Sequence, residues 1–153
     1  MKILVCTDGS AHSRKALERA AMFAEGINID EVAVIHVDEG SLDLTAYGRD
    51  GKTRSVAVLD SKSIDKRIIE DVEKREMILQ EALKVFEEKH IKARTILKKG
   101  HPSSTIMSVA AEEGFDVIII GSRGLSGMQK MFLGSVSNAI VQEAKNCTVI
   151  VVK

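Results

Sequence analysis

The sequence predicts an α/β fold in which five parallel strands form one sheet, in the order 3-2-1-4-5, with helices on both faces. Short apolar runs alternate along the chain with longer segments whose apolar residues recur at helical spacing. This alternation predicts a parallel sheet, because a helix supplies the crossover that each parallel neighbour needs. The first and fourth apolar runs end in short polar turns that contain glycine. Ligands of such sheets bind where the strand order reverses, so we place these two strands side by side.

The first two strands and the helix between them follow directly from the apolar pattern. Residues 2–7, KILVCT, form a continuous apolar run, as expected for a strand that is buried on both faces. A helix is expected from about Ser10, because apolar residues recur on one face, and Gly26 is a suitable stop. Residues 31–37, EVAVIHV, are expected to form the second strand.

An insertion at about residues 39–62 interrupts this alternation, since the segment is polar and rich in Gly, Ser and Asp. Within it, Asp50 and Gly51 are the residues that a two-residue hairpin turn prefers. Two interpretations remain open for the insertion, a small β-hairpin and a mobile loop. The length of the chain suits one domain over residues 1–153.

The second half of the chain repeats the alternation of helix and strand. A long helix is expected over about residues 64–89, followed at residues 92–98 by a more polar strand that suits the edge of a sheet. Pro102 stands just inside the next helix, where its missing N–H has no cost, and Gly114 ends that helix. The remaining elements are a strand over residues 116–121, a helix from Ser135 to about Ala144, and a strand over residues 147–153.

The composition limits the classes of function. Lys plus Arg number 22 and Asp plus Glu number 22, so the formal net charge is zero. General binders of nucleic acids or membrane surfaces carry a basic excess, and only 3% of the residues are aromatic, so neither partner is expected. The apolar runs are too short for a signal peptide or a transmembrane span, and the two cysteines lack CxxC spacing. These features indicate a cytoplasmic protein.

Residues 121–135, GSRGLSGMQKMFLGS, contain four glycines, two cations and no acid. Glycine lets another group approach the backbone closely, and Gly134 precedes a helix whose first N–H groups have no partner within the helix. These donors favour an anion, most commonly phosphate, to which Arg123 and Lys130 add positive charge. The donors are the amides of Ser135, Val136 and Ser137, with the hydroxyls of the two serines. The alternative is that the glycines only shape a turn and cap the helix.

The spacing of Gly121, two residues, Gly124, nine residues and then Gly134-Ser135 is similar to the G-x2-G-x9-G-[ST] signature of ATP-binding universal stress proteins. The resemblance extends over nearly the whole chain, including ILVCTDGS at its start, VIHV, DVIIIGSRG and the closing CTVIVV. It implies a Rossmann-like fold of the adenine nucleotide alpha-hydrolase type that binds adenine nucleotides. It also implies a protein that is commonly dimeric, cytoplasmic and linked to stress.

The same resemblance implies contacts to the base and the ribose. Asp8 would contact the ribose or the edge of the adenine. Cys6 and Thr7 would approach the base through their backbone. Val37, which ends the second strand, would pack on the adenine, and Ile120 would form part of the pocket for base and ribose.

The phosphate contacts follow from the signature itself. Gly121 and Gly124 would contact the ribose and the phosphates, with Arg123 adding charge beside them. The residues that would hold the β- and γ-phosphates are Gly134, Ser135, Val136 and Ser137. A divalent ion, Mg²⁺, would be held mainly by phosphate oxygens, because hard cations commonly keep waters in such sites. The sequence does not separate ATP from ADP or AMP.

Three functions fit these features, and the first is the one we expect. In a binding module, ATP would order residues 122–134 and so change a surface that a partner protein reads. A slow ATPase or an autophosphorylating enzyme is the second; fast turnover is not expected, since the glycine-rich loop has no carboxylate to act as a base. A dimeric scaffold without nucleotide is the third. The apolar last strand also predicts a homodimer joined along residues 147–153.

Overall fold

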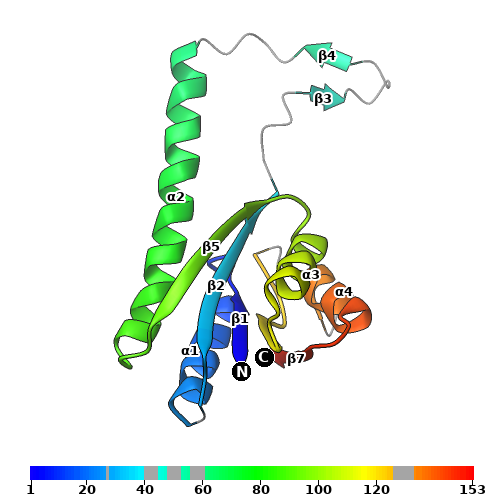
Figure 1. The fold of residues 1–153 in the computed structure, drawn as a ribbon. Helices are drawn as coiled ribbons and strands as arrows, with labels where there is room; N and C mark the ends of the chain where they lie inside the picture. Colours follow the sequence, from blue (N-terminus) through cyan, green and yellow to red (C-terminus); the bar gives the residue numbers. More distant parts are fainter. Residues whose placement is uncertain (27, 40–44, 48–52, 56–60, 126–132) are drawn as a thin grey trace.

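The computed structural model of the chain describes residues 1–26, 28–39, 45–47, 53–55, 61–125 and 133–153, with the backbone alone at residues 45–47, 53–55 and 61–68. Its main sheet has five parallel strands in the order β5-β2-β1-β6-β7 (Figure 1). These strands are β1 (Lys2–Cys6), β2 (Glu31–Asp38), β5 (Ala93–Lys99), β6 (Val117–Gly121) and β7 (Thr148–Val152). Because β5 is the strand that was predicted third along the chain, the predicted order 3-2-1-4-5 is confirmed.

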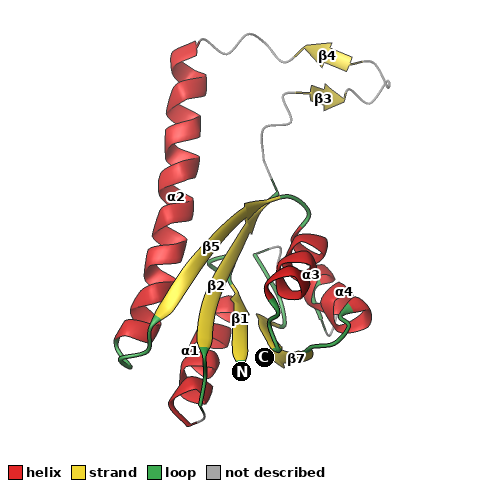
Figure 2. Cartoon of the chain, viewed as in Figure 1, coloured by secondary structure: helices red, strands yellow, loops and turns green. Residues whose placement is uncertain are grey.

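Helices cover both faces of the sheet, as predicted (Figure 2). The helices of the described chain are α1 (Ala11–Gly26), α2 (Ser61–Glu87), α3 (Pro102–Glu113) and α4 (Ser135–Glu143). The pair α1 and α2 packs on one face, and the pair α3 and α4 packs on the other. None of the helices in the described part of the chain combines the length and the apolar content that crossing a bilayer requires.

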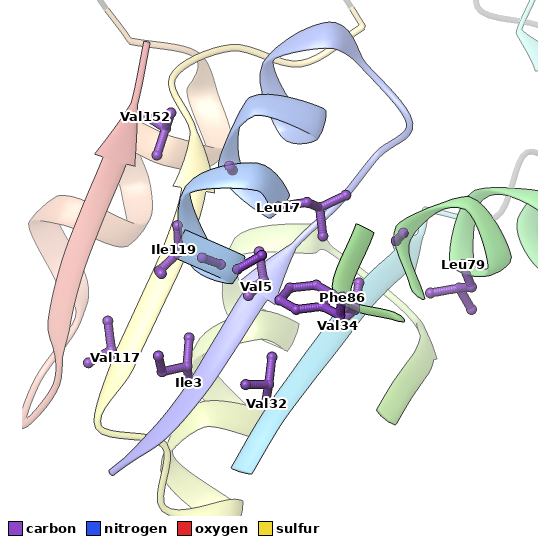
Figure 3. Packing of buried hydrophobic residues seen from close by; sticks show 14 residues of the cluster. Ile3, Val5, Leu17, Val32, Val34, Leu79, Phe86, Val117, Ile119 and Val152 are labelled. Atoms are coloured by element: carbon purple, nitrogen blue, oxygen red, sulfur yellow. The ribbon is translucent and has the colours of Figure 1, made fainter. Parts of the chain in front are cut away.

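The side chains of each strand alternate between two separate cores. Ile3 and Val5 of β1 lie in one cluster with Leu17 of α1 and Phe86 of α2, and Phe86 is completely buried (Figure 3). Leu4 points to the opposite face and packs in the cluster formed with α3 and α4. A sheet that is buried on both faces explains why its inner strands are continuous apolar runs.

The ends of α3 lie where the sequence predicts them. Pro102 is in the first turn, and His101 before it has the extended backbone of an N-cap residue, with φ −72° and ψ 123°. Gly114 ends the helix in the left-handed conformation, with φ 70° and ψ 45°. Only glycine adopts this conformation without strain, so the predicted stop has a local cause.

The insertion contains two short strands, β3 (Thr45–Tyr47) and β4 (Thr53–Ser55). They pair antiparallel in a separate sheet, with Ala46 opposite Arg54. This pairing corresponds to the hairpin interpretation of the insertion. The predicted turn residues, Asp50 and Gly51, lie outside the described residues.

Charged side chains join the starts of neighbouring strands at the amino end of the sheet, where the parallel strands begin. Arg94 of β5 donates to Glu31 of β2 at 2.5 Å and also bonds to Glu113 at the end of α3. Its guanidinium carbon lies 5.9 Å from the centre of the Phe115 ring. Arg94 therefore connects two strands, a helix end and a buried aromatic ring.

Lys2 of β1 completes this group of ion pairs. Its ammonium lies 3.0 Å from the Glu31 carboxylate and donates to the carbonyl of Glu113. The amino terminus at Met1 bonds to Asp30, just before β2. The hydrogen bond from Arg94, and secondly that from Lys2, holds the pKa of Glu31 below its usual value. We name these joined residues, Met1, Lys2, Asp30, Glu31, Arg94 and Glu113, the amino-end network.

Candidate functional site

A cavity of about 400 Å³ opens at the carboxyl ends of β1, β2 and β6, beside the first turn of α4. This is the place where the order of the strands reverses, since β1 lies between β2 and β6. The predicted contact residues all line it: Cys6, Thr7, Asp8, Val37, Ile120, Gly121, Arg123, Gly124, Gly134, Ser135, Val136 and Ser137. The structure therefore brings the whole predicted set together, and the contact of each residue with a ligand stays a prediction.

One part of the cavity is apolar and lies on the face of the sheet that α3 and α4 cover. Cys6 and Ile120 are almost buried there, beside Ile106 of α3. Burial, and secondly the charge of Asp8, raises the pKa of the Cys6 thiol, so this residue acts as a small apolar side chain. Sequence reasoning did not include Pro102 or Ile106, because nothing in the local pattern shows that α3 reaches the ends of β1 and β6.

The first turn of α4 forms the polar part of the cavity. Gly134 is its N-cap residue, with φ −70° and ψ 162°, and no side chain of the described residues caps the helix. The hydrogen bonds found among the described residues use none of the amides of Ser135, Val136 and Ser137. Three backbone donors at a helix end of partial positive charge thus face a cavity, as an anion site requires.

The hydroxyl of Ser137 has acceptors within the protein. It donates within the protein, with the carbonyl oxygens of Ser122 at 3.1 Å and Gly134 at 3.0 Å as acceptors, and the side chain is only 2% exposed. In this structure the proton of the hydroxyl is shared inside the protein, and its donation to an anion stays a prediction. The backbone amide of Ser137 remains available.

Two glycines of the signature, Gly121 and Gly124, are each required by a different contact in the structure. A Cβ atom on Gly121 would lie 2.7 Å from the carbonyl carbon of His12, so this glycine is required by the packing of β6 against α1. A Cβ atom on Gly124 would lie 2.6 Å from an oxygen of Asp8. Neither residue has positive φ. The predicted need for close approach to the backbone is real at both positions, and the approaching atoms belong to the protein itself.

Gly134 is less constrained than the other two glycines. The nearest atom to a Cβ placed there is the Cα of Arg123 at 3.4 Å, which is an ordinary contact. Its φ of −70° is accessible to any residue. The remaining glycine of the stretch, Gly127, and the predicted cation Lys130 lie outside the described residues.

Asp8 links the two turns that border the cavity. One oxygen accepts the amide of Ser10 at 3.0 Å, which stabilises the turn after β1. The other oxygen accepts the amide of Leu125 at 3.1 Å, from a residue 117 positions away in the sequence. Asp8 is therefore both a turn residue and a residue of the cavity.

His36, at the end of β2, is a buried histidine with a satisfied hydrogen bond. Its Nδ1 lies 2.9 Å from the carbonyl oxygen of Thr7, and because that oxygen can only accept, Nδ1 carries the proton. Thr7 also donates its amide to the carbonyl of Ile35 at 2.9 Å. Both backbone groups of Thr7 therefore have partners, and the carbonyl keeps one lone pair for a further donor.

Carboxylates that the sequence did not associate with the glycine-rich loop also reach the cavity. Asp38 and Glu39, at the end of β2, are among the residues that line it. Asp38 forms an ion pair with Arg75 of α2 at 2.8 Å. No group of three or more His, Cys, Asp or Glu side chains that could hold a metal ion is found among the residues that the structure describes.

The comparisons with known proteins agree with this architecture. The sequence model of the universal stress protein family matches residues 1–153. The universal stress protein YxiE of Bacillus subtilis is 32% identical over 159 residues, which cover 99% of this chain and 98% of that protein.

Two solved structures have the same fold. The universal stress protein UspA of Lactobacillus plantarum has a TM-score of 0.74 and 22% identity, covering 100% of this chain and 97% of that one. The universal stress protein of Archaeoglobus fulgidus in complex with dAMP has a TM-score of 0.66 and 22% identity, covering 100% and 98% of the two chains. Together with the family match over its full length, these comparisons show that the chain belongs to the universal stress protein family.

Proposed function

We propose that this protein is an ATP-binding module that acts as a nucleotide-dependent switch. The observation that carries the proposal is the first turn of α4, where the amides of Ser135, Val136 and Ser137 have no partner among the described residues and line a cavity at the strand ends. A polyphosphate would bind these amides. The apolar part of the cavity, between Ile120 and Ile106, would hold the adenine.

Two further observations support an adenine nucleotide as the ligand. The volume of about 400 Å³ is in the range of small-molecule sites, which is about 300–1,000 Å³. The Archaeoglobus fulgidus protein of the same fold is a complex with dAMP. We infer that ATP is the preferred nucleotide here, because successive amides at a helix end, with the positive charge of Arg123 in the same cavity, suit a chain of negatively charged phosphates.

A divalent ion would accompany the triphosphate in this proposal. No cluster of acidic or imidazole side chains that could bind the ion alone is found in the described chain. Mg²⁺ readily binds through phosphate oxygens and waters with only one or two carboxylates, and a carboxylate such as Glu39 lines the cavity. The ion would therefore arrive with the nucleotide and add charge compensation on the phosphates.

The switch would act through the turn after β6. Leu125 is 69% exposed, and its amide contacts Asp8 at the edge of the cavity. A nucleotide bound beside Gly124 would change how this exposed apolar residue is presented to a partner protein. Ordering of a segment by a bound nucleotide is a known basis for such switching.

Slow ATP hydrolysis is a second candidate function, and one observation favours it. Although the glycine-rich loop has no acid, the fold brings Asp8, Asp38 and Glu39 to the same cavity. Asp8 and Asp38 already have protein partners. In this candidate function, the carboxylate of Glu39 would therefore orient the attacking water. Phosphoryl transfer needs such a group beside the terminal phosphate.

We also propose a homodimer joined along β7. The other edge strand, β5, carries Arg94, Lys98 and Lys99, and charged residues of this kind protect an edge from pairing. The sequence of β7, TVIVV, has no charged residue. An uncharged edge is suited to pairing with the same strand of a second copy. Sedimentation of the protein as a monomer at micromolar concentration would contradict this part of the proposal.

The decisive experiment measures what the purified protein binds. Mass spectrometry of released ligand should show an adenine nucleotide, and calorimetry of the stripped protein should give tighter binding of ATP than of AMP. Absence of ATP binding in equilibrium dialysis at millimolar concentration would overturn the proposal and favour the dimeric scaffold. A turnover of about 10 per second, a typical enzyme value, would instead favour the enzyme.

A further inference from the structure

We propose that Asp8 is a positioning residue for phosphate recognition, which holds the turn at residues 122–125 in place instead of binding the ribose. The family resemblance assigns Asp8 to the ribose or to the adenine edge, so this inference changes the role of a predicted contact. It rests on the proposed nucleotide function and concerns how the same cavity recognises the phosphates.

The contacts of Asp8 carry the inference. Its two oxygens accept different backbone amides, that of Ser10 at 3.0 Å and that of Leu125 at 3.1 Å. The carboxylate is thus a bridge between the turn after β1 and the turn after β6. A hydrogen bond to a charged acceptor is among the stronger ones in proteins, so this bridge fixes the outer end of residues 122–125.

The inner end of the same turn is fixed by other contacts. Ser122 is 3% exposed and donates its amide to the carbonyl of Val152 at 2.7 Å. Its own carbonyl accepts the amide of Gly134 at 2.7 Å and the hydroxyl of Ser137 at 3.1 Å. The turn is therefore tied to α4 at one end and to β1 at the other, through Asp8.

Gly124 shows how closely the two turns approach each other. A Cβ atom on this residue would lie 2.6 Å from the Asp8 oxygen that bonds to Leu125. Any side chain at position 124 would displace the carboxylate. The glycine and the aspartate are thus two halves of one contact, and changing either one should move the turn.

Charge gives this inference a test with a definite sign. A carboxylate beside a polyphosphate repels it, so removing the charge of Asp8 should strengthen ATP binding if charge were its only effect. If Asp8 positions the turn, its removal should weaken ATP binding despite that repulsion. If Asp8 binds the ribose, its removal should weaken the binding of every adenosine ligand alike.

The experiment compares adenosine, AMP, ADP and ATP by calorimetry with the wild-type protein, Asp8→Ala and Asp8→Asn. We expect Asp8→Ala to lower the affinity for ATP by about tenfold or more, the value of a hydrogen bond to a charged group, while adenosine changes by less than about twofold. Asp8→Asn keeps one acceptor oxygen, so its affinity for ATP should fall by less than that of Asp8→Ala. Asp38→Asn is the matched control, because it removes a carboxylate of the same cavity that pairs with Arg75 of α2.

Two results would overturn the inference. One is an equal loss of affinity for all four ligands, which assigns Asp8 to the ribose. The other is an ATP affinity that stays the same or rises, as expected for Asp38→Asn. If the wild-type protein binds none of the four ligands, the proposed nucleotide function fails instead, so the two failures are distinguishable.

Hydrogen exchange gives a readout that does not depend on the ligand. The Leu125 amide should exchange faster in Asp8→Ala and in Gly124→Ala than in the wild type, while the core amides of β1 keep their protection. If Asp8→Ala does not fold, Asp8→Asn and Gly124→Ala carry the same test. An unchanged exchange rate at Leu125 in folded variants would contradict the positioning role.

Discussion

The two ends of the central sheet contrast in how their polar groups are satisfied. At the amino end, the amino-end network joins the starts of β1, β2 and β5 by ion pairs, and Lys2 and Arg94 both lie over the Phe115 ring. At the carboxyl end, the backbone donors of α4 face a cavity of about 400 Å³ and have no partner among the described residues.

This difference separates stability from binding within one small fold. At the carboxyl end, backbone donors without a partner among the described residues can bind a ligand. At the amino end, the charges are already paired with one another and contribute to stability. Variants at the amino end should therefore change unfolding and leave binding intact, and variants of the α4 amides should do the reverse.

The largest effect is expected at a carboxyl-end residue that does not obey this separation. Gly121→Ala places a Cβ atom 2.7 Å from the backbone of His12, where neither side can yield easily. We expect a loss of about 3 kcal/mol in the free energy of unfolding, the upper part of the range for overpacking. Urea denaturation measures it. Gly134→Ala is the control, since its closest contact is 3.4 Å, and equal stability of the two variants would contradict the packing argument.

The next largest effect concerns the α4 amides. Ser135 is the first residue of α4, where proline is tolerated, and Gly134 before it has the extended ψ of 162° that proline requires. Ser135→Pro removes one amide donor and should weaken ATP binding by about tenfold with little change in stability. Ser135→Ala is the matched control, because it removes the hydroxyl and keeps the amide. Equal ATP affinity of the two variants in calorimetry would count against phosphate binding by the amides at the start of α4.

A smaller effect is expected from the amino-end network. Arg94→Met keeps an apolar stem over Phe115 and removes the ion pairs with Glu31 and Glu113. The Arg94 side chain is 45% exposed, so solvent screening limits the expected loss of stability to about 1 kcal/mol. ATP affinity should not change. The control is Arg14→Met, which breaks the exposed ion pair with Glu18 on α1 and should hardly change the free energy of unfolding. A change in ATP affinity with Arg94→Met would refute the separation of the two ends.

The smallest effect is the pH dependence of the same network. The hydrogen bond from Arg94, and secondly that from Lys2, lowers the pKa of Glu31 in the folded protein below its usual value of 4.5. The unfolded chain therefore takes up this proton first as the pH falls. The stabilisation is complete above pH 4.5 and is lost as the pH falls through the lower, folded pKa. The stability difference between wild type and Arg94→Met should shrink over this range in denaturation at a series of pH values; a constant difference would contradict the role of Glu31.

Much of the fold could be predicted because its signals are local. The apolar runs of β1 and β6, the proline at the start of α3 and the left-handed Gly114 at its end each depend on residues within a few positions. The order of the strands followed from the two glycine-containing turns. The set of residues around the cavity followed from the same turns and from the resemblance to the family.

The contacts inside the site could not be predicted in this way. Nothing near Gly121 in the sequence shows that the backbone of His12 lies against it. The proton of the Ser137 hydroxyl is shared with the carbonyls of Ser122 and Gly134, and no spacing rule distinguishes this from donation to a ligand. Residues from other strand ends, such as Glu39, enter the cavity only because the sheet brings them there.

By itself the sequence determined the strands, the helices, their order in the sheet and the helix end that faces the cavity. Only the tertiary structure decided which atoms surround that helix end, including the bridge of Asp8 to an amide 117 positions away. The physical reason is the distance along the chain over which each kind of interaction acts. Periodicity, caps and turns act between near neighbours in the chain, whereas a hydrogen bond between two strand-end turns forms only after packing has brought them together.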